Sequence, residues 1–264
     1  MSRRSDEEAA GTPIEAARVS RPFVQRWGGA FMLSAQLAEV ERGAGLRSRA
    51  LYFRGRAGVL GEVPPAVVAD LFGIFPGWLL DAVLPAAAEA VGAAEAVTAY
   101  QEAASRWARA TLAGLAEPER LAGLLRRLVE AAEPSGLALF GGWRRVAWPE
   151  GGAERVVHGL NVLREYRGGV HFAALRAVGL TVPEAVVADP EGGRGRLLRT
   201  AWRPEAAEEL IARAEAKPGL RERWHRAQRM TDERMGELIE DGLAEPEWAE
   251  LTGRLRALDA TARS

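Results

Sequence analysis

The stretch RALYFRGRAGVLGEVPPAVVADLFGIFPGWLLDAVLP, residues 49–85, has the composition of short helices joined by tight turns. Prolines follow the turn residues, at positions suited to the first turn of a helix, where a missing amide hydrogen does little harm. Pro76 and Pro85 are expected to bound the last helix of the stretch. No part of the chain alternates apolar and polar residues long enough to predict a convincing strand. The fold class is therefore predicted to be mainly α.

The helical period continues outward from this stretch in both directions. Apolar residues between Phe23 and Leu37 recur every three or four positions, as on one face of a helix. Two Ala/Leu-rich helices are expected at about 93–114 and 118–132. A further helix is expected at 153–167; after a break at Gly168–Gly169, another runs to Leu180. Short helices are expected at TVPEAVVAD and RPEAAEELIARAEA, and a long one from near Leu220 onward.

Four segments are predicted from these patterns. Residues 1–20 are polar and are expected to be disordered, and residues 21–134 form a helical N-terminal domain. A glycine- and tryptophan-rich connector covers 135–152, and a helical C-terminal domain covers 153–264. The boundary rests on the connector's glycines, which interrupt the helical pattern.

Composition excludes several classes of protein. The chain has 35 basic and 36 acidic residues and no cysteine, so disulfides and thiolate chemistry are ruled out. No apolar run approaches the roughly 20 residues that span a bilayer, and the N-terminus has no signal-peptide core. We expect a cytoplasmic protein without a membrane partner. The charge balance also lacks the overall basic surplus that is typical of nucleic-acid binding.

Two blocks resemble an uncharacterised, mostly actinobacterial helix-turn-helix family. Residues 49–85 are similar to its block YFxxRAxPLGxVPxxVVxxxFxxFxPxxVxxxLP, and LREYRGGVHFAAL (163–175) is similar to its signature LREHRGDGHVAAL. The resemblance implies a helical N-terminal half packed on a winged-helix-like C-terminal half. It also implies a polar signature, carried here by Tyr52, Arg56, Glu165, Arg167 and His171.

The chain departs from the family pattern at several polar positions. Gly169 replaces an aspartate and Tyr166 a histidine, while Leu137 and Trp143 replace an arginine and an asparagine. The segment AKPGLRERWHRAQ leaves no room for the two strands of a wing, so the wing is expected to be vestigial or missing. Any chemistry that needs the replaced groups is not expected in this chain.

A DNA-binding role is the alternative that the resemblance raises. The expected recognition helix, RPEAAEELIARAEAK, carries carboxylates at its N-terminal end, which would face the phosphates of DNA. Upstream arginines could touch the DNA backbone, and His225 lies in an arginine-rich pattern expected to be exposed surface. The carboxylates in question are Glu205, Glu208 and Glu209, and the arginines are Arg194, Arg196, Arg199 and Arg203. Binding to DNA is on this ground disfavoured.

A polar pocket is the competing prediction. His158, Asn161 and Glu165 share one face of a helix, and a turn at Gly168–Gly169 would place His171 in the first turn of the next helix. There the helix dipole favours a neutral imidazole. A buried Glu–Arg pair that only joins two helices explains the same residues without any chemistry.

If the pocket is functional, Arg56 and Arg167 would hold a carboxylate or phosphate and Glu165 with His171 would act as an acid/base pair. Ligand contacts are assigned to Tyr52, Arg56, Trp143, His158, Asn161 and Arg167. We expect an anionic small-molecule-binding protein, with catalysis left open; the alternative is a ligand-responsive helix-turn-helix regulator. A structural or interaction protein, whose Ala/Leu-rich helices would form a homodimer, is a further alternative. No motif specifies a metal or any cofactor.

Overall fold

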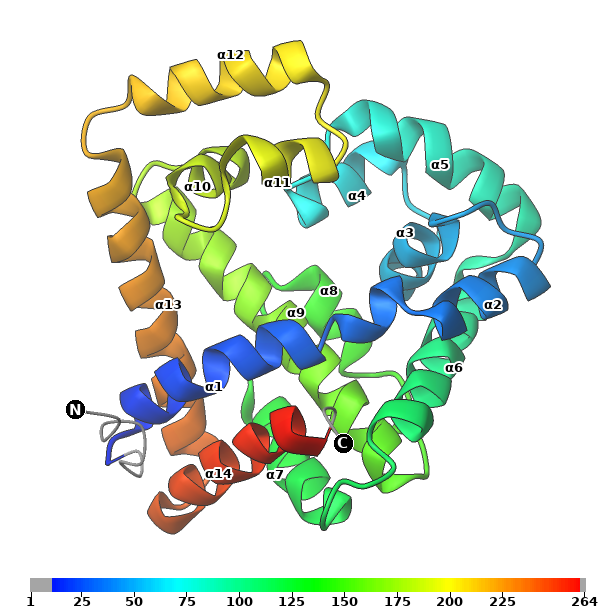
Figure 1. Cartoon of the computed structure of the whole chain (residues 1–264), viewed down its shortest axis with the longest axis vertical. Coiled ribbons are helices and arrows are strands. Elements are labelled where there is room, and N and C mark those ends of the chain that lie inside the picture. The colour runs from blue at the N-terminus through cyan, green and yellow to red at the C-terminus, as the bar shows by residue number, and fades with distance from the viewer. Residues whose placement is uncertain (1–10, 262–264) are drawn as a thin grey trace. The chain divides into compact units, whose positions relative to one another are not determined.

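The computed structural model describes residues 11–261, in which every regular element is a helix and none is a strand (Figure 1). This confirms the prediction of a mainly α fold. The longer helices are α1 (Pro13–Trp27), α2 (Ala35–Gly43), α5 (Gly77–Ala90), α6 (Ala93–Thr111), α7 (Pro118–Ala131), α9 (Gly152–Ala177), α12 (Pro204–Glu215), α13 (Leu220–Gly242) and α14 (Glu245–Thr261). The shorter ones are α3 (Ala50–Ala57), α4 (Pro65–Phe72), α8 (Ala138–Trp143), α10 (Val182–Ala188), α11 (Gly193–Arg199) and the 3₁₀ helices η1 (Ala30–Leu33) and η2 (Gly58–Leu60).

The helices form two compact units. Unit 1 draws its described residues from 11–40, 100–167 and 232–261, and unit 2 is built from Glu41–Ala99 and Gly168–Thr231. Helices α2, α6, α9 and α13 each contribute residues to both units. Each unit therefore combines segments from before and after the 135–152 connector. The predicted domain boundary at that connector is based on the sequence alone, and it stays a prediction.

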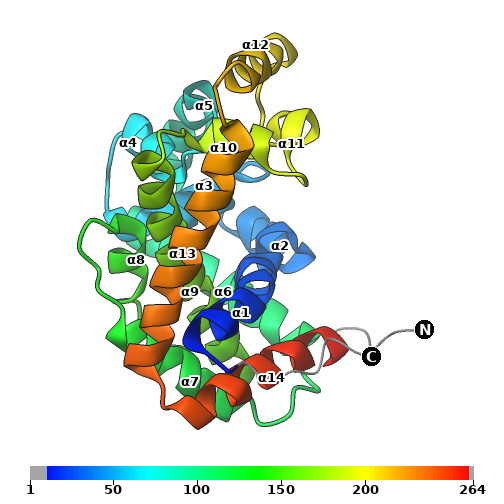
Figure 2. The same cartoon turned by 90° about the vertical axis from the view of Figure 1, so that its left-hand side faces the viewer.

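In unit 1, helix α1 lies against α14 (Figures 1 and 2). The indole nitrogen Nε1 of Trp27 donates to Oδ1 of Asp259 at 2.8 Å. Where α1 ends, a Cβ on Gly28 would lie 2.5 Å from the backbone oxygen of Leu160 on α9. Only glycine allows this approach, because real Cβ atoms do not come so close to a carbonyl oxygen.

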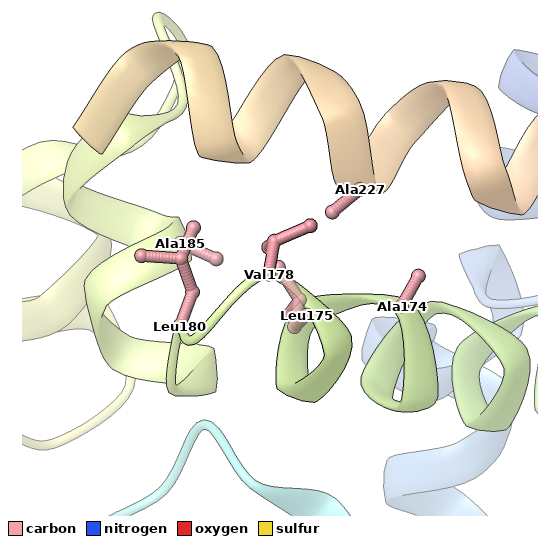
Figure 3. Close-up of a cluster of buried hydrophobic side chains, with 6 residues drawn as sticks. All are labelled: Ala174, Leu175, Val178, Leu180, Ala185 and Ala227. Carbon is pink, nitrogen blue, oxygen red and sulfur yellow. The ribbon is translucent and has the colours of Figure 1, made fainter. Parts of the chain in front are cut away.

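In unit 2, the end of α9 packs against α10 and the start of α13. Figure 3 shows the apolar side chains that fill this contact, with Ala227 of α13 facing Ala174 of α9 and Val178, which directly follows α9. The buried cluster consists of Ala174, Leu175, Val178, Leu180, Ala185 and Ala227. Burial of this apolar surface fixes α13 on one side, so the opposite side of its first turns is exposed.

Unit 2 also contains a duplicated octapeptide. VPPAVVAD (63–70) and VPEAVVAD (182–189) are identical at seven of eight positions and lead into α4 and α10. The one difference places Pro65 opposite Glu184. Pro65 keeps Pro64 extended, with ψ 146°, so α4 begins at Pro65. Glu184 instead completes a capping box with Thr181, and α10 begins two residues earlier in the repeat.

The structure corrects two local predictions. Helix α9 runs through Gly168–Gly169 without a break, although glycine lowers helix stability by about 1 kcal/mol per residue. Buried residues on both sides of the glycines anchor the helix, so packing outweighs local propensity. Pro85 lies inside α5 rather than at its end. It is exposed, and so is Asp81, whose carbonyl loses its helical partner and remains accessible to water.

The N-terminal region also differs from expectation. Helix α1 begins at Pro13, within the segment 1–20 that was expected to be disordered, and Thr12 caps it by accepting from the amide of Glu15. The polar composition of this segment did not indicate a helix, because the buried face of that helix is made of small residues such as Ala16 and Ala17. Residues 1–10 of that prediction lie outside the described residues.

Candidate functional site

Three helices of unit 2 form a compact module in which α10, α11 and α12 all pack on one another (Figure 1). Val186, Leu197, Ala207 and Leu210 form its buried core. A four-residue turn, 200–203, joins α11 to α12, and Ala201 within it has a left-handed φ of 69°. Pro204 then starts α12 at the first helical position. Two helices joined by so short a turn, with a third packed behind them, make a helix-turn-helix arrangement.

The turn is held from inside and from outside the module. The hydroxyl of Thr200 donates to the carbonyl of Arg196, and the amide of Trp202 donates to the carbonyl of Leu197 at 3.1 Å. The Trp202 indole donates to the carbonyl oxygen of Ile74 at 2.8 Å, in the segment between α4 and α5. These bonds fix the direction in which α12 leaves the turn.

The exposed face of α12 carries charges of both signs. Glu205, Glu209 and Arg213 are exposed, and Glu208 forms an ion pair with Arg194 of α11. Arg196 is 3.1 Å from a carboxylate oxygen of Asp189, which leaves less of its charge for a ligand.

Two exposed arginines flank the turn. Arg199 ends α11 and Arg203 caps α12, and neither forms an ion pair with a described residue. The guanidinium of Arg203 lies 5.4 Å from the ring centre of Trp78. These two arginines are the cations of the module that are best placed for an anionic partner.

Of the residues predicted to form a pocket, Tyr52 and Arg56 come together on α3 in unit 2. Nη1 of Arg56 donates to the Tyr52 hydroxyl at 3.2 Å, and its guanidinium carbon lies 4.1 Å from the ring centre of Phe72. Such stacking stabilises a half-buried guanidinium.

His171, also in unit 2, lies in the interior of α9, so the prediction that it opens a new helix is wrong. The dipole argument for a neutral imidazole fails with it. Nδ1 of His171 is 2.9 Å from the Thr231 hydroxyl, which donates its own hydrogen to the carbonyl of Ala227. Thr231 can then only accept, so Nδ1 of His171 carries a proton.

The remaining predicted residues lie in unit 1, where they are buried: Trp143, His158, Asn161, Glu165 and Arg167. Because α9 is a regular helix here, His158, Asn161 and Glu165 do share a face, as their spacing predicted. Nη1 of Arg164 contacts Oε1 of Glu165 at 3.2 Å. The Trp143 ring packs against Tyr100, with ring centres 5.4 Å apart.

Two of these buried groups have altered acidity. Burial lowers the pKa of His158 to about 4, and its ring lies against that of Trp148. Burial also lowers the pKa of Arg167 to about 10, although Asp232, 3.9 Å away, opposes the change. At neutral pH His158 is therefore uncharged, whereas Arg167 keeps its charge.

A small cavity in unit 1 is lined by Ser20, Arg21 and Arg167 together with apolar side chains. Its volume is about 20 Å³, which is room for one water molecule. Sites for small organic ligands are usually more than ten times larger. This cavity therefore does not support small-molecule binding. Within residues 11–261 there is also no cluster of three side chains that could hold a metal ion.

Across the same described residues, no single helix is long and apolar enough to cross a membrane; two pairs of helices reach that length and hydropathy only when combined across a sharp bend.

Two contacts in unit 2 were not foreseen from sequence. Lys217, the chain's single lysine, donates to the carbonyl of Gly179 at 2.9 Å and to Glu184 at 2.8 Å. Trp202 is not among the residues that the sequence pattern singled out. The sequence does contain a hint of both contacts. A chain's single lysine, or a tryptophan between two helices, indicates a specific contact.

The module of α10, α11 and α12 defines the chain as a helix-turn-helix protein. Comparison with known families agrees, because residues 17–264 match the model of the helix-turn-helix family, and the chain belongs to that family. No curated protein matches the chain. No solved structure matches it either.

Proposed function

We propose that the chain is a transcription regulator that binds double-stranded DNA with α12 as its recognition helix. The helix-turn-helix geometry of α10, α11 and α12, in a chain that belongs to the helix-turn-helix family, carries the proposal. This replaces small-molecule binding as the preferred function, since the family match favours DNA binding and the cavity beside Arg167 is too small for such a ligand. A response to an anionic ligand at Tyr52, Arg56, Glu165, Arg167 and His171 stays a prediction.

The charges of the module suggest how it would read DNA. Arg199 and Arg203 flank the turn and would donate to backbone phosphates, which positions a protein without reading sequence. Glu205 and Glu209 on the exposed face of α12 would accept from the N4 amino group of cytosine in the major groove. The carboxylates that oppose nonspecific binding would thus contribute to specificity.

Selection from a randomised DNA library, followed by fluorescence anisotropy on the selected duplex, tests the proposal. We expect binding that weakens steeply with salt, since phosphate contacts release counterions. Arg199→Ala/Arg203→Ala should weaken binding to every duplex. Glu205→Ala/Glu209→Ala should reduce the preference for the selected sequence by about 1–3 kcal/mol per lost base contact. If the chain is a homodimer, the selected site should be a palindrome.

The matched control is Arg42→Ala/Arg256→Ala, which removes the same charge from two exposed arginines outside the module. It should bind like the wild type. Failure to enrich any sequence, together with no salt-dependent binding to duplex DNA, would overturn the proposed function.

A further inference from the structure

We infer that the main phosphate-binding surface of the chain is the exposed side of the first three turns of α13, formed by Arg221, Arg226 and Arg229. We call these three residues the α13 basic face. The inference rests on the proposed function and assigns most of the DNA-backbone contacts, beyond those of Arg199 and Arg203, to the helix that follows the recognition helix. It places them where winged-helix proteins use a β-wing, which the described residues of this chain do not contain.

The packing of α13 decides which side of the helix is exposed. Ala227 is fully buried against the end of α9 and α10 (Figure 3). The half-buried Leu220, Trp224 and Met230 border the same contact. At 3.6 residues per turn, Arg229 lies on the side opposite Ala227, and Arg221 and Arg226 flank it. All three arginines are exposed. Packing within unit 2 therefore leaves the α13 basic face accessible.

None of the three arginines is neutralised by an ion pair with a described residue. Other basic groups of unit 2 are engaged: Arg194 with Glu208, Arg196 with Asp189, and Lys217 with Glu184. Arg223, on the same helix, donates to backbone carbonyls of Val178 and Pro218 and so has a structural role. Exposed arginines without an ion pair also occur elsewhere in the described part of unit 2, but the α13 basic face gathers three of them on one side of a single helix.

Positive charge is also concentrated at the start of α13, although Glu222 and Glu233 lie four residues from Arg226 and Arg229 on the same side of the helix, a spacing that favours opposite charges. Residues 219–229 hold four arginines and one carboxylate, in a chain with a net charge of −1. Arg226 and Arg229 are three residues apart, a spacing at which like charges destabilise a helix slightly. The carboxylate, Glu222, lies in the first turn of α13, where the helix dipole favours it. Glu233 is the next exposed acid along the helix.

The dimensions suit a DNA backbone. Arg221 and Arg229 are eight residues apart, or about 12 Å along the helix axis. That length corresponds to roughly three to four base-pair steps of 3.4 Å on one strand. The acidic face of α12 cannot supply this attraction, because Glu205, Glu208 and Glu209 outnumber its exposed arginine. Positive charge from α13 offsets that repulsion and directs α12 toward the groove.

The test compares two triple variants of the full chain by fluorescence anisotropy over a range of salt concentrations. The first is Arg221→Ala/Arg226→Ala/Arg229→Ala. The second, Arg42→Ala/Arg47→Ala/Arg256→Ala, makes the same change in net charge at exposed arginines that form no ion pair with described residues. Each is measured on the duplex selected by the wild type and on a random duplex of equal length. Circular dichroism and thermal melting verify that both variants fold.

If the α13 basic face binds phosphates, its variant should lose affinity about equally for both duplexes, by at least about tenfold near physiological salt. The slope of log K against log salt should become less steep by roughly two to three, because each phosphate contact contributes about 0.9. The control should retain the wild-type slope.

Two results would overturn the inference, and they can be told apart. If the α13 variant binds like the wild type while Arg199→Ala/Arg203→Ala loses affinity, the inference fails and the proposed function stands. If the wild type itself shows no salt-dependent binding to either duplex, both the proposed function and the inference fail.

Discussion

The indole of Trp202 donates a hydrogen bond to the carbonyl oxygen of Ile74 at 2.8 Å, joining the turn before α12 to the turn before α5. This bond ties the start of α12 to the N-terminal part of unit 2. Trp202→Phe would leave the Ile74 carbonyl without that donor, so we expect the free energy of unfolding to fall by about 1–3 kcal/mol. Denaturant unfolding measures this change. The exposed Trp78, changed to Phe, is the control and should shift stability by less than about 0.5 kcal/mol.

The continuity of α9 can be tested at its glycines. A Cβ on Gly168 would meet no atom within 4 Å, so Gly168→Ala should stabilise the protein by about 0.5–1 kcal/mol through helix propensity. A destabilised Gly168→Ala variant would indicate a bend at this position.

Gly28→Ala should have the opposite effect. Its new methyl group would lie 2.5 Å from the Leu160 carbonyl oxygen and 2.6 Å from that of Val24. We expect a loss of about 1–3 kcal/mol, since backbone would have to move to make room. Thermal and denaturant unfolding of the two glycine variants, measured side by side, give the comparison directly.

Glu165 is buried in unit 1, with Nη1 of Arg164 as one partner at 3.2 Å. Removing a buried carboxylate leaves positive charge without compensation, so Glu165→Ala should lower stability by about 3–5 kcal/mol. Glu165→Gln keeps the shape and part of the hydrogen bonding and should cost less. Equal melting temperatures for wild type and both variants would contradict this structural role.

The lowered pKa of His158 leads us to expect that the stability of the protein depends on pH. Burial holds its pKa at about 4 in the folded protein, against an ordinary value of 6.5. The unfolded chain therefore binds more protons between these values, and the free energy of unfolding falls as the pH drops from 6.5 toward 4. The loss attributable to this group approaches about 3 kcal/mol near pH 4.

Unfolding free energies of the wild type and of His158→Gln, measured between pH 7 and pH 4, check this pH dependence. The variant should lack this part of the slope, since glutamine does not titrate. Parallel profiles for the two proteins would show that His158 is not the group responsible.

Much of the helical architecture could be predicted from sequence, because apolar periodicity and capping signals are local. The helices expected at about 93–114 and 118–132 agree with α6 and α7, and the expected recognition helix agrees with α12. The failures at Gly168–Gly169 and Pro85 have one cause. Tertiary packing outweighed a local preference of one to a few kcal/mol, and that packing cannot be read from the residues themselves.

The candidate site was harder to predict than the fold. The sequence pattern drew attention to uncommon ionisable residues near Glu165, whereas the helix-turn-helix module lies further along the chain. The carboxylates of α12 were interpreted as evidence against DNA binding because they would face the phosphates of DNA. The arginines around His225 in α13 were expected only to be exposed surface. Their importance depends on which side of α13 is buried, and only the packing around Ala227 shows this.

The near-identity of VPPAVVAD and VPEAVVAD means that, while the chain is folding, either segment has the apolar surface to occupy the other's place. Such an exchange could lead to a kinetic trap or to swapped dimers. The position at which they differ opposes it. Glu184 caps its own helix and binds Lys217, whereas proline at the matching position can do neither. Glu184, with its partners Thr181 and Lys217, thus makes the two segments non-equivalent.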